Sequence, residues 1–278
     1  MDFLKRFARN RGALIGLVLL LVLISFALIA PYLYPQNPWR TVARPFLPPF
    51  SIDRFPLGTD TLGRDIAAGL IHGARVSLAI GVTSTIVALL IGVPLGAMAG
   101  YRGGLIDDAL MRFTEFFQTI PSFALAIVLI AIMQPTLGSI VLAIGIVSWP
   151  PVARLVRGEV LSLKTREYVQ AAITLGQSTP KIIFSQILPN AIAPIIVMGS
   201  LMIASAILLE SALSFLGLGD PNFISWGYMV GAGRGRLLDA WWISFFPGIA
   251  IFLSVLALNL AGEGLNDALN PRLARGRH

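Results

Sequence analysis

EYVQAAITLGQSTPKIIFSQILPN, residues 167–190, is the most polar long stretch of a chain that is otherwise largely apolar. Its pattern predicts two short helices exposed to the cytosol. A helix over 167–175 is too short to be stable alone in water, so it must pack on something. It can pack on its own membrane domain, or its small residues can offer a close-fitting surface to another subunit. The residues themselves leave both readings open.

Local signals set the bounds of these two helices. Gly176 stands where a helix commonly ends in a left-handed conformation. Thr179 and Pro180 indicate a second helix start, with a hydroxyl N-cap followed by proline. We expect this second helix to stop at Pro189. The first helix has an apolar face at i, i+3, i+4, i+7 spacing, widened by two further residues: Tyr168, Ala171, Ala172 and Leu175, then Val169 and Ile173.

The composition of the whole chain places it in a membrane. Of 278 residues, 56% are hydrophobic and 13% are charged, whereas soluble domains carry roughly 25% charged residues. There is no cysteine, and the two histidines, His72 and His278, are far apart. These facts exclude a disulfide framework and argue against a metal site built on His and Cys. We interpret the net charge of +7 as basic cytoplasmic loops rather than a nucleic-acid site.

Six apolar stretches are long enough to cross a bilayer core, which needs about 20 residues. Their composition predicts α-helices, and the alternating segments of a β-barrel are absent from the sequence. The expected fold is therefore an all-α integral membrane protein with six transmembrane helices. The first stretch exceeds the apolar core of a signal peptide, so we expect it to be a retained anchor. The predicted spans are 12–32, 77–100, 113–133, 137–155, 191–216 and 243–263.

Lysine and arginine residues predict the orientation, because they gather on the cytoplasmic side. With both termini cytoplasmic, 14 of the 21 basic residues lie inside and 7 lie outside. The inside set is Lys5, Arg6, Arg9, Arg11, Arg102, Arg112, Arg154, Arg157, Lys164, Arg166, Lys181, Arg272, Arg275 and Arg277. The outside set is Arg40, Arg44, Arg54, Arg64, Arg75, Arg234 and Arg236.

Several residues in or near the spans carry their own expectations. Small residues at four-residue spacing, Gly92, Gly96 and Gly100, predict close helix packing, with a hinge at Pro94 as the alternative. Prolines near span ends are expected to end helices: Pro121, Pro150 and Pro151. Two acids could form an ion relay, but we expect Glu115 at the cytoplasmic boundary near Arg112, and Glu210 capping or pairing near the outer face.

The segment from 32 to 75 is expected to be an outer loop, irregular where it is rich in proline. Asp60, Arg64 and Asp65 follow the prolines. They predict either an interfacial helix whose charges pair with one another, or a surface that seats a partner or gates the outer mouth. Three tryptophans are expected in an interfacial aromatic belt: Trp226, Trp241 and Trp242.

Residues 167–190 also resemble the EAA motif of the permease subunits of binding-protein-dependent ABC importers, which usually reads E-A-A-x3-G-x9-I-x-L-P. The chain departs from that motif at Gln170, in the Glu position, and at Gln186, in the first Ile position. The Ala pair, the glycine and the Leu-Pro end are intact. The resemblance implies an ATPase-coupling set: Glu167, Tyr168, Gln170, Ala171, Ala172, Gly176, Leu188 and Pro189.

Three further blocks resemble the C-type permeases of dipeptide, oligopeptide and nickel importers, in matching order along nearly the whole chain. They span residues 55–81, 215–230 and 262–273. The first block contains an outer-loop motif: Gly58, Asp60, Gly63, Arg64 and Asp65.

The resemblance implies a type I ABC importer permease in the bacterial inner membrane. Residues 1–76 would form an anchor helix and outer loop, and 77–278 a core domain of five helices with a coupling element at 156–190. The implied partners are a second, B-type permease, two cytosolic ATPases that bind ATP and Mg, and an extracytoplasmic binding protein. The implied cargo is di- or oligopeptides, with nickel or another small cargo as the alternative.

The sequence supports one part of this division of labour independently. A phosphate-binding P-loop needs Gly-Lys-Ser/Thr, but Lys5, Lys164 and Lys181 follow Leu, Leu and Pro. The chain is therefore expected to hold no cofactor and to catalyse nothing itself. A secondary transporter would need paired intramembrane acids and inverted repeats, and neither is evident. A membrane-anchored scaffold or sensor would need a sizeable soluble domain.

Overall fold

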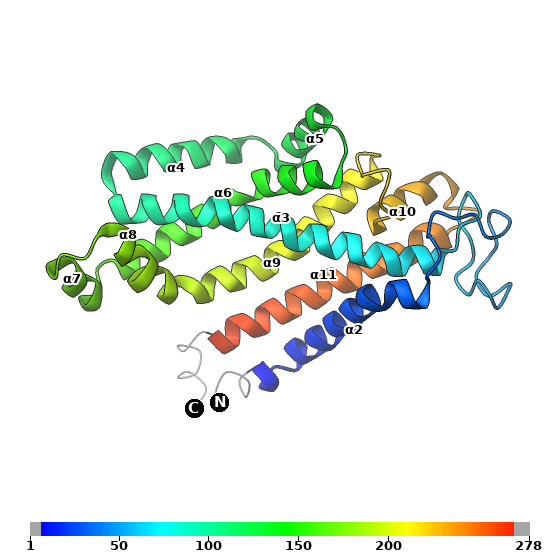
Figure 1. The fold of residues 1–278 in the computed structure, drawn as a ribbon, viewed down its shortest axis with the longest axis horizontal. Helices are drawn as coiled ribbons and strands as arrows, with labels where there is room; N and C mark the ends of the chain where they lie inside the picture. Colours follow the sequence, from blue (N-terminus) through cyan, green and yellow to red (C-terminus); the bar gives the residue numbers. More distant parts are fainter. Residues whose placement is uncertain (1–6, 270–278) are drawn as a thin grey trace.

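The structure is a computed structural model that describes residues 7–269. Its long helices run side by side along the long axis of the molecule (Figure 1). Within the described part of the chain, extended backbone pairing is limited to isolated bridges in the outer loop. The helices are α2 (Arg11–Leu33), α3 (Ile66–Arg102), α4 (Gly104–Thr119), α5 (Ser122–Met133), α6 (Leu137–Leu163), α7 (Glu167–Thr174), α8 (Thr179–Ile182), η1 (Ile183–Ile187, a π-turn), α9 (Leu188–Phe215), α10 (Trp226–Gly233), η2 (Arg234–Arg236) and α11 (Trp242–Leu269).

Five helical stretches are long and apolar enough to cross a membrane, and α4 with α5 makes a sixth if the pair is one span. The all-α expectation is confirmed. The predicted third span, 113–133, is divided between α4 and α5, which meet at a bend of 86°, and the helix end expected at Pro121 is confirmed. The bend falls at Ile120 and Pro121. Proline lacks an N–H and disfavours helical backbone at the residue before it, so α4 ends there.

The two ends of the molecule differ. Helices α7 and α8 form one end, toward which the start of α2 and the end of α11 also point (Figure 1). Asn10 Nδ2 donates to Asp267 Oδ2 at 3.0 Å and fastens these two helix ends together. The outer loop and α10 lie at the other end. This arrangement fits the predicted orientation. Basic residues of that prediction, Lys5, Arg6, Arg272, Arg275 and Arg277, and the terminal His278, lie outside the described residues.

Helix α3 packs on α6 along its glycines. A Cβ atom added at Gly96 would lie 2.3 Å from the carbonyl oxygen of Ala153, and one at Gly92 would lie 2.6 Å from Val152 Cβ. At Gly100 it would lie 2.8 Å from the Arg157 oxygen. The packing role predicted from the four-residue spacing is confirmed.

Two of the predicted helix ends are wrong. Helix α6 continues through Pro150 and Pro151 to Leu163. Two lost backbone hydrogen bonds are tolerated there because the flanking Val152 and Ala153 are fully buried and hold the helix in place. The second helix does not stop at Pro189 either. It passes through the π-turn η1 into α9, where Pro189 lies in the first turn and its missing N–H costs little.

The polar and aromatic residues near the outer end are more buried than expected. Glu210 is 1% exposed. Instead of pairing with a cation, it accepts a hydrogen bond from Ser214 Oγ at 2.7 Å. Trp226 and Trp242 are also buried, and their indole N–H groups donate to backbone oxygens, so the belt prediction is wrong for both. Trp241 is exposed, as a belt residue would be, and Glu115 is exposed on α4.

Candidate functional site

Helix α7 presents two different faces. Val169 is fully buried and Ala172 nearly so, packed in one cluster with Ile182 and Ile187. The rest of the helix surface is exposed, and Leu175 at the C-cap is 80% accessible. Among the residues of the predicted apolar face, Ala172 therefore packs against the chain's own membrane domain. Tyr168, Ala171 and Leu175 are exposed. The two readings left open by the sequence therefore apply to different parts of the surface of one helix.

The end of α7 matches its predicted signal. Gly176 has φ of +73°, and the N–H of Gln177 donates to the Ala172 oxygen at 3.1 Å. A side chain at Gly176 would meet no neighbouring atom, so the glycine is needed for its backbone conformation. The N-cap position of the next helix is Ser178 rather than Thr179, and the Ser178 side chain forms no capping hydrogen bond. The remaining residues of the predicted set lie close by: Glu167 in the first turn of α7, Leu188 partly buried, and Pro189 exposed.

A chain of hydrogen bonds ties α7 to two long helices. Gln170 Nε2 donates to the Lys164 carbonyl oxygen at 2.8 Å, at the end of α6. Lys164 Nζ in turn donates to the Tyr101 oxygen of α3 at 3.1 Å. The cation thus satisfies carbonyls at a helix C-terminus, where positive charge is favourable. A glutamate carboxylate at position 170 could not donate this first bond.

Two aspartates that the sequence analysis did not single out join separate helices. Asp107 in the first turn of α4 pairs with Arg157 of α6. Asp220, in the loop after α9, accepts a hydrogen bond from the backbone N–H of Leu137 at 2.8 Å, at the start of α6. An acidic residue in the first helical turn was the available signal for Asp107. Asp220 lies 83 residues from Leu137, so no local signal pointed to its contact.

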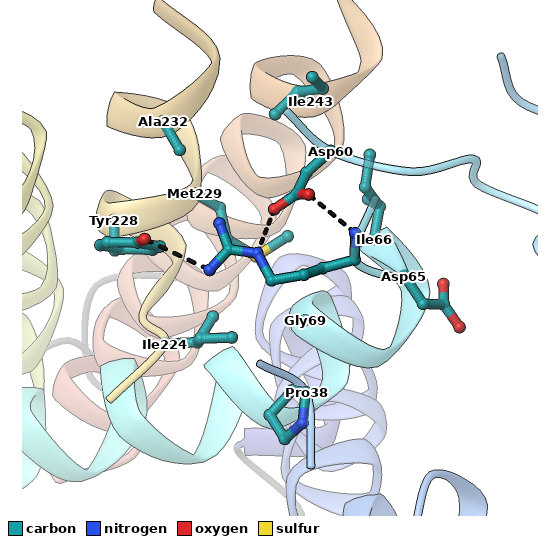
Figure 2. A pocket seen from close by; sticks show the side chains of 11 residues that line it. Pro38, Asp60, Asp65, Ile66, Gly69, Ile224, Tyr228, Met229, Ala232 and Ile243 are labelled. Atoms are coloured by element: carbon teal, nitrogen blue, oxygen red, sulfur yellow. Dashed lines mark hydrogen bonds and ion pairs between the residues drawn. The ribbon is translucent and has the colours of Figure 1, made fainter. Parts of the chain in front are cut away.

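The outer-loop motif is a compact turn (Figure 2). Asp60 Oδ1 accepts the N–H groups of Leu62 and Arg64, and Asp60 Oδ2 accepts from Arg64 Nε at 2.5 Å. The charges pair with one another as predicted, but the predicted interfacial helix is wrong. The carboxylate takes up backbone donors in a turn and so stabilises a non-helical conformation.

Arg64 is held between elements far apart in the sequence. It is 5% exposed, and its guanidinium lies 5.0 Å from the ring centroid of Trp39. Its Nη1 donates to Tyr228 Oη of α10 at 3.4 Å (Figure 2). Burial acts to lower the pKa of Arg64, but the bond to Tyr228 and the charge of Asp60 outweigh it, so its pKa lies above the usual value. The ion pair of Asp60 and Arg64 therefore joins the outer loop to α10.

The other residues of the outer motif support the same turn. Asp65 caps α3 by accepting the Ala67 N–H at 2.9 Å. Burial raises the pKa of Asp65, and the backbone bonds partly oppose this. Gly58 and Gly63 lie where a side chain would run into backbone oxygens of the preceding loop. The residues of the outer-loop motif thus lie close together, and their contacts within this chain stabilise the turn.

A hollow of about 690 Å³ lies where the α4–α5 bend meets α6 and α9. No charged side chain lines it. Its polar lining consists of Gln118, Ser122, Ser148 and Ser205, and the rest is apolar. Pro121, Pro150 and Pro151 line it too. No cluster of three or more His, Cys, Asp or Glu suited to a metal ion occurs within residues 7–269.

Comparison with protein families gives two matches along the chain. Residues 92–275 match the model described as binding-protein-dependent transport system inner membrane component. Residues 1–51 match the N-terminal transmembrane domain of oligopeptide transport permease C. Together the two matched regions cover most of the sequence and leave residues 52–91 and 276–278 outside.

Individual proteins give the same result. The chain is 43% identical to the di/tripeptide transport system permease protein DppC of Pseudomonas aeruginosa, over 98% of this chain and 92% of that protein. It is 39% identical to the oligopeptide transport system permease protein OppC of Bacillus subtilis, over 99% and 90% respectively. The fold is similar to a chain of the inward-facing MetNI methionine ABC transporter, with a TM-score of 0.60, 17% identity, and 73% of this chain covered.

Proposed function

The chain belongs to the family of binding-protein-dependent transport system inner membrane components, and from this premise we propose that it imports di- and oligopeptides as the C-type permease subunit of an ATP-driven transporter. It is a multi-pass inner-membrane permease subunit of the ABC importer type. Support for the cargo comes from relatives named for dipeptides and oligopeptides, which align with nearly all of this chain.

ATP hydrolysis is assigned to partner subunits. None of the chain's three lysines follows a glycine, so it has no P-loop to bind ATP and Mg. The proposed assembly contains this chain, a second permease, two cytosolic ATPases and an extracytoplasmic binding protein. We also propose that residues 1–76 serve as anchor and outer loop, and that 77–278 form the transport core with the coupling element at 156–190.

The observation that supports the proposal most directly is that α7 has one buried side and one exposed side. Its buried face fixes it to the membrane domain through Val169 and Ala172. Its exposed face, with Tyr168, Ala171 and Leu175, is free for an ATPase. Because Gln170 and Lys164 tie it to α6 and α3, a displacement of α7 would move both long helices. ATPase closure would then favour one conformation of the pathway over the other.

The hollow at the α4–α5 bend is the chain's proposed contribution to the pathway. It lies beside the apolar surface of α9 and carries hydroxyl and amide groups without formal charge. Such a lining can hydrogen-bond to peptide amides and does not select for side-chain charge. The second permease would close the hollow from the other side. At the outer end, the turn around Asp60 and Arg64 would present the loop to the binding protein.

The test is affinity purification of the tagged chain from gently solubilised membranes, followed by mass spectrometry, with dipeptide uptake measured in cells that have or lack the gene. We expect a second permease and one or two P-loop ATPases to copurify, and dipeptide uptake to depend on the chain. Recovery of the chain alone, with transport driven by an ion gradient, would contradict the proposal. Loss of nickel uptake with normal dipeptide uptake would overturn the cargo.

A further inference from the structure

An apolar groove of about 290 Å³ runs between α3 and the segment that follows the coupling helix. One wall is formed by Pro94 and Met98 of α3, and the other by Ile183 and Phe184 of η1. Phe184 is 71% exposed. Arg102, the last residue of α3, lies at one end of the groove and is its one charged lining residue. The groove is therefore mainly apolar, with Thr179 as its one uncharged polar lining residue and a basic residue at its mouth.

The α3 residues Pro94, Met98 and Arg102 of the groove wall face away from the contact between α3 and α6. Gly92, Gly96 and Gly100 of α3 are turned toward α6. Pro94, Met98 and Arg102 follow each of these by two positions, which is about 200° around a helix at 3.6 residues per turn. They therefore lie on the opposite side of α3 from the α6 seam. The hollow proposed as the pathway involves α4–α5, α6 and α9, and α3 contributes nothing to it.

Arg102 at the mouth of the groove has no acidic partner in the described part of the chain. Among the ion pairs within residues 7–269, the basic residues are Arg64, Arg157 and Arg236, so Arg102 has no carboxylate within ion-pair distance there. It ends a membrane-spanning helix at the end of the molecule that carries α7 and α8 (Figure 1). Basic pockets between spans on the cytoplasmic side bind anionic lipid headgroups.

We propose that this groove binds one anionic phospholipid, with an acyl chain between α3 and η1 and the headgroup phosphate on Arg102. The apolar walls match the acyl chain, and the unpaired guanidinium matches the phosphate. Because η1 and α8 directly follow α7, the lipid would brace the coupling element against α3. Lipid binding in the groove is independent of the proposed function. The bracing of the coupling element by the lipid rests on that function.

The binding test uses the purified full chain and native mass spectrometry, titrated separately with phosphatidylglycerol and phosphatidylcholine. We expect retention of phosphatidylglycerol at about fivefold lower concentration, since one basic residue near an anionic headgroup contributes roughly 1 kcal/mol. Arg102→Ala should abolish this preference, whereas Arg112→Ala, an exposed cation on α4 outside the groove, should keep it. Met98→Trp, which fills the groove, should weaken retention of both lipids.

Equal lipid preference in the wild-type chain and Arg102→Ala would overturn the proposal, provided that both have the same helical circular dichroism and Tm. A second readout uses the absence of native cysteine. A maleimide should label Phe184→Cys in the assembled complex, and phosphatidylglycerol should protect it. Crosslinking of that cysteine to the second permease, with no protection by lipid, would show that a protein fills the groove and would also overturn the proposal. Neither readout requires transport, so failure here is distinct from failure of the proposed function.

Discussion

Arg157 of α6 and Asp107 of α4 form a two-point ion pair, with Nε 2.5 Å from Oδ1 and Nη2 2.6 Å from Oδ2. The pair joins the first turn of α4 to α6, seven residues before the lysine that ties α6 to α3. Helices α3, α4 and α6 are thus joined at the end of the molecule that carries α7. The charge-bias argument placed Arg157 on this side but gave no partner for it.

Replacing Asp107 by asparagine should lower the stability of the solubilised chain by about 1–3 kcal/mol, because a charge-assisted bond of the partly buried arginine is lost. The measurement is Tm in detergent, together with dipeptide uptake. Asp108→Asn is the matched control, since Asp108 is exposed and adjacent. An equal loss in both variants would show that the ion pair has no special role.

The seam between α3 and α6 predicts opposite effects for two Gly→Ala changes. Gly96→Ala should destabilise the chain by about 1–3 kcal/mol, because the new methyl group would lie against the Ala153 oxygen. Gly158→Ala, on α6 with open space around it, should be neutral or stabilise by up to about 1 kcal/mol. Thermal unfolding followed by circular dichroism separates the two. Similar stability in both variants would contradict close packing at Gly96.

The two neighbouring alanines of α7 should separate docking from packing. Ala171→Leu changes the exposed face, so it should leave Tm nearly unchanged and abolish coupled uptake. Ala172→Leu overpacks a buried position and should cost about 1–3 kcal/mol of stability. The measurement is Tm and peptide uptake for both. Normal uptake in Ala171→Leu would remove the docking role from the exposed face.

The outer turn should depend on Arg64. Arg64→Ala leaves Asp60 buried and unpaired, which should cost about 3–5 kcal/mol. Arg64→Lys keeps the charge but loses the planar stacking on Trp39, so an intermediate loss is expected. Arg40→Ala, an exposed outer-loop arginine, is the control. Protease sensitivity of the loop and Tm are the readouts. A loss confined to Arg40→Ala would contradict the assignment.

Hydropathy alone predicted much of this fold, because apolar length determines which segments can cross a bilayer. It could not predict the 86° bend near Pro121, because the rule that proline ends a helix gives the position of the break and not the angle between the two helices. Nor could local rules show that α6 continues past Pro150. Proline removes a hydrogen bond in any helix, and tertiary packing decides whether the helix survives.

The candidate site was predictable only where the signal is local. Gly176 adopts the left-handed conformation that its position after the predicted helix indicated. The division of α7 into a buried and an exposed face depends on contacts with Ile182 and Ile187, and helical periodicity alone could not distinguish Ala171 from Ala172. The Asp60 partner of Arg64 is local, but Tyr228 lies 164 residues from Arg64, and Arg157 lies 50 residues from Asp107, so no local pattern indicated these two contacts.

The central claim is that the exposed face of α7 binds the ATPase, and site-directed crosslinking tests it most directly. The chain has no native cysteine, so Ala171→Cys introduces a single thiol. Leu105→Cys, exposed on α4, is the control. In the assembled complex, we predict that a short bifunctional reagent joins Ala171→Cys to the ATPase and that maleimide labelling there falls when the ATPase is present, while labelling at Leu105→Cys is unchanged. Unaltered labelling of Ala171→Cys in a complex that still contains the ATPase would contradict the account.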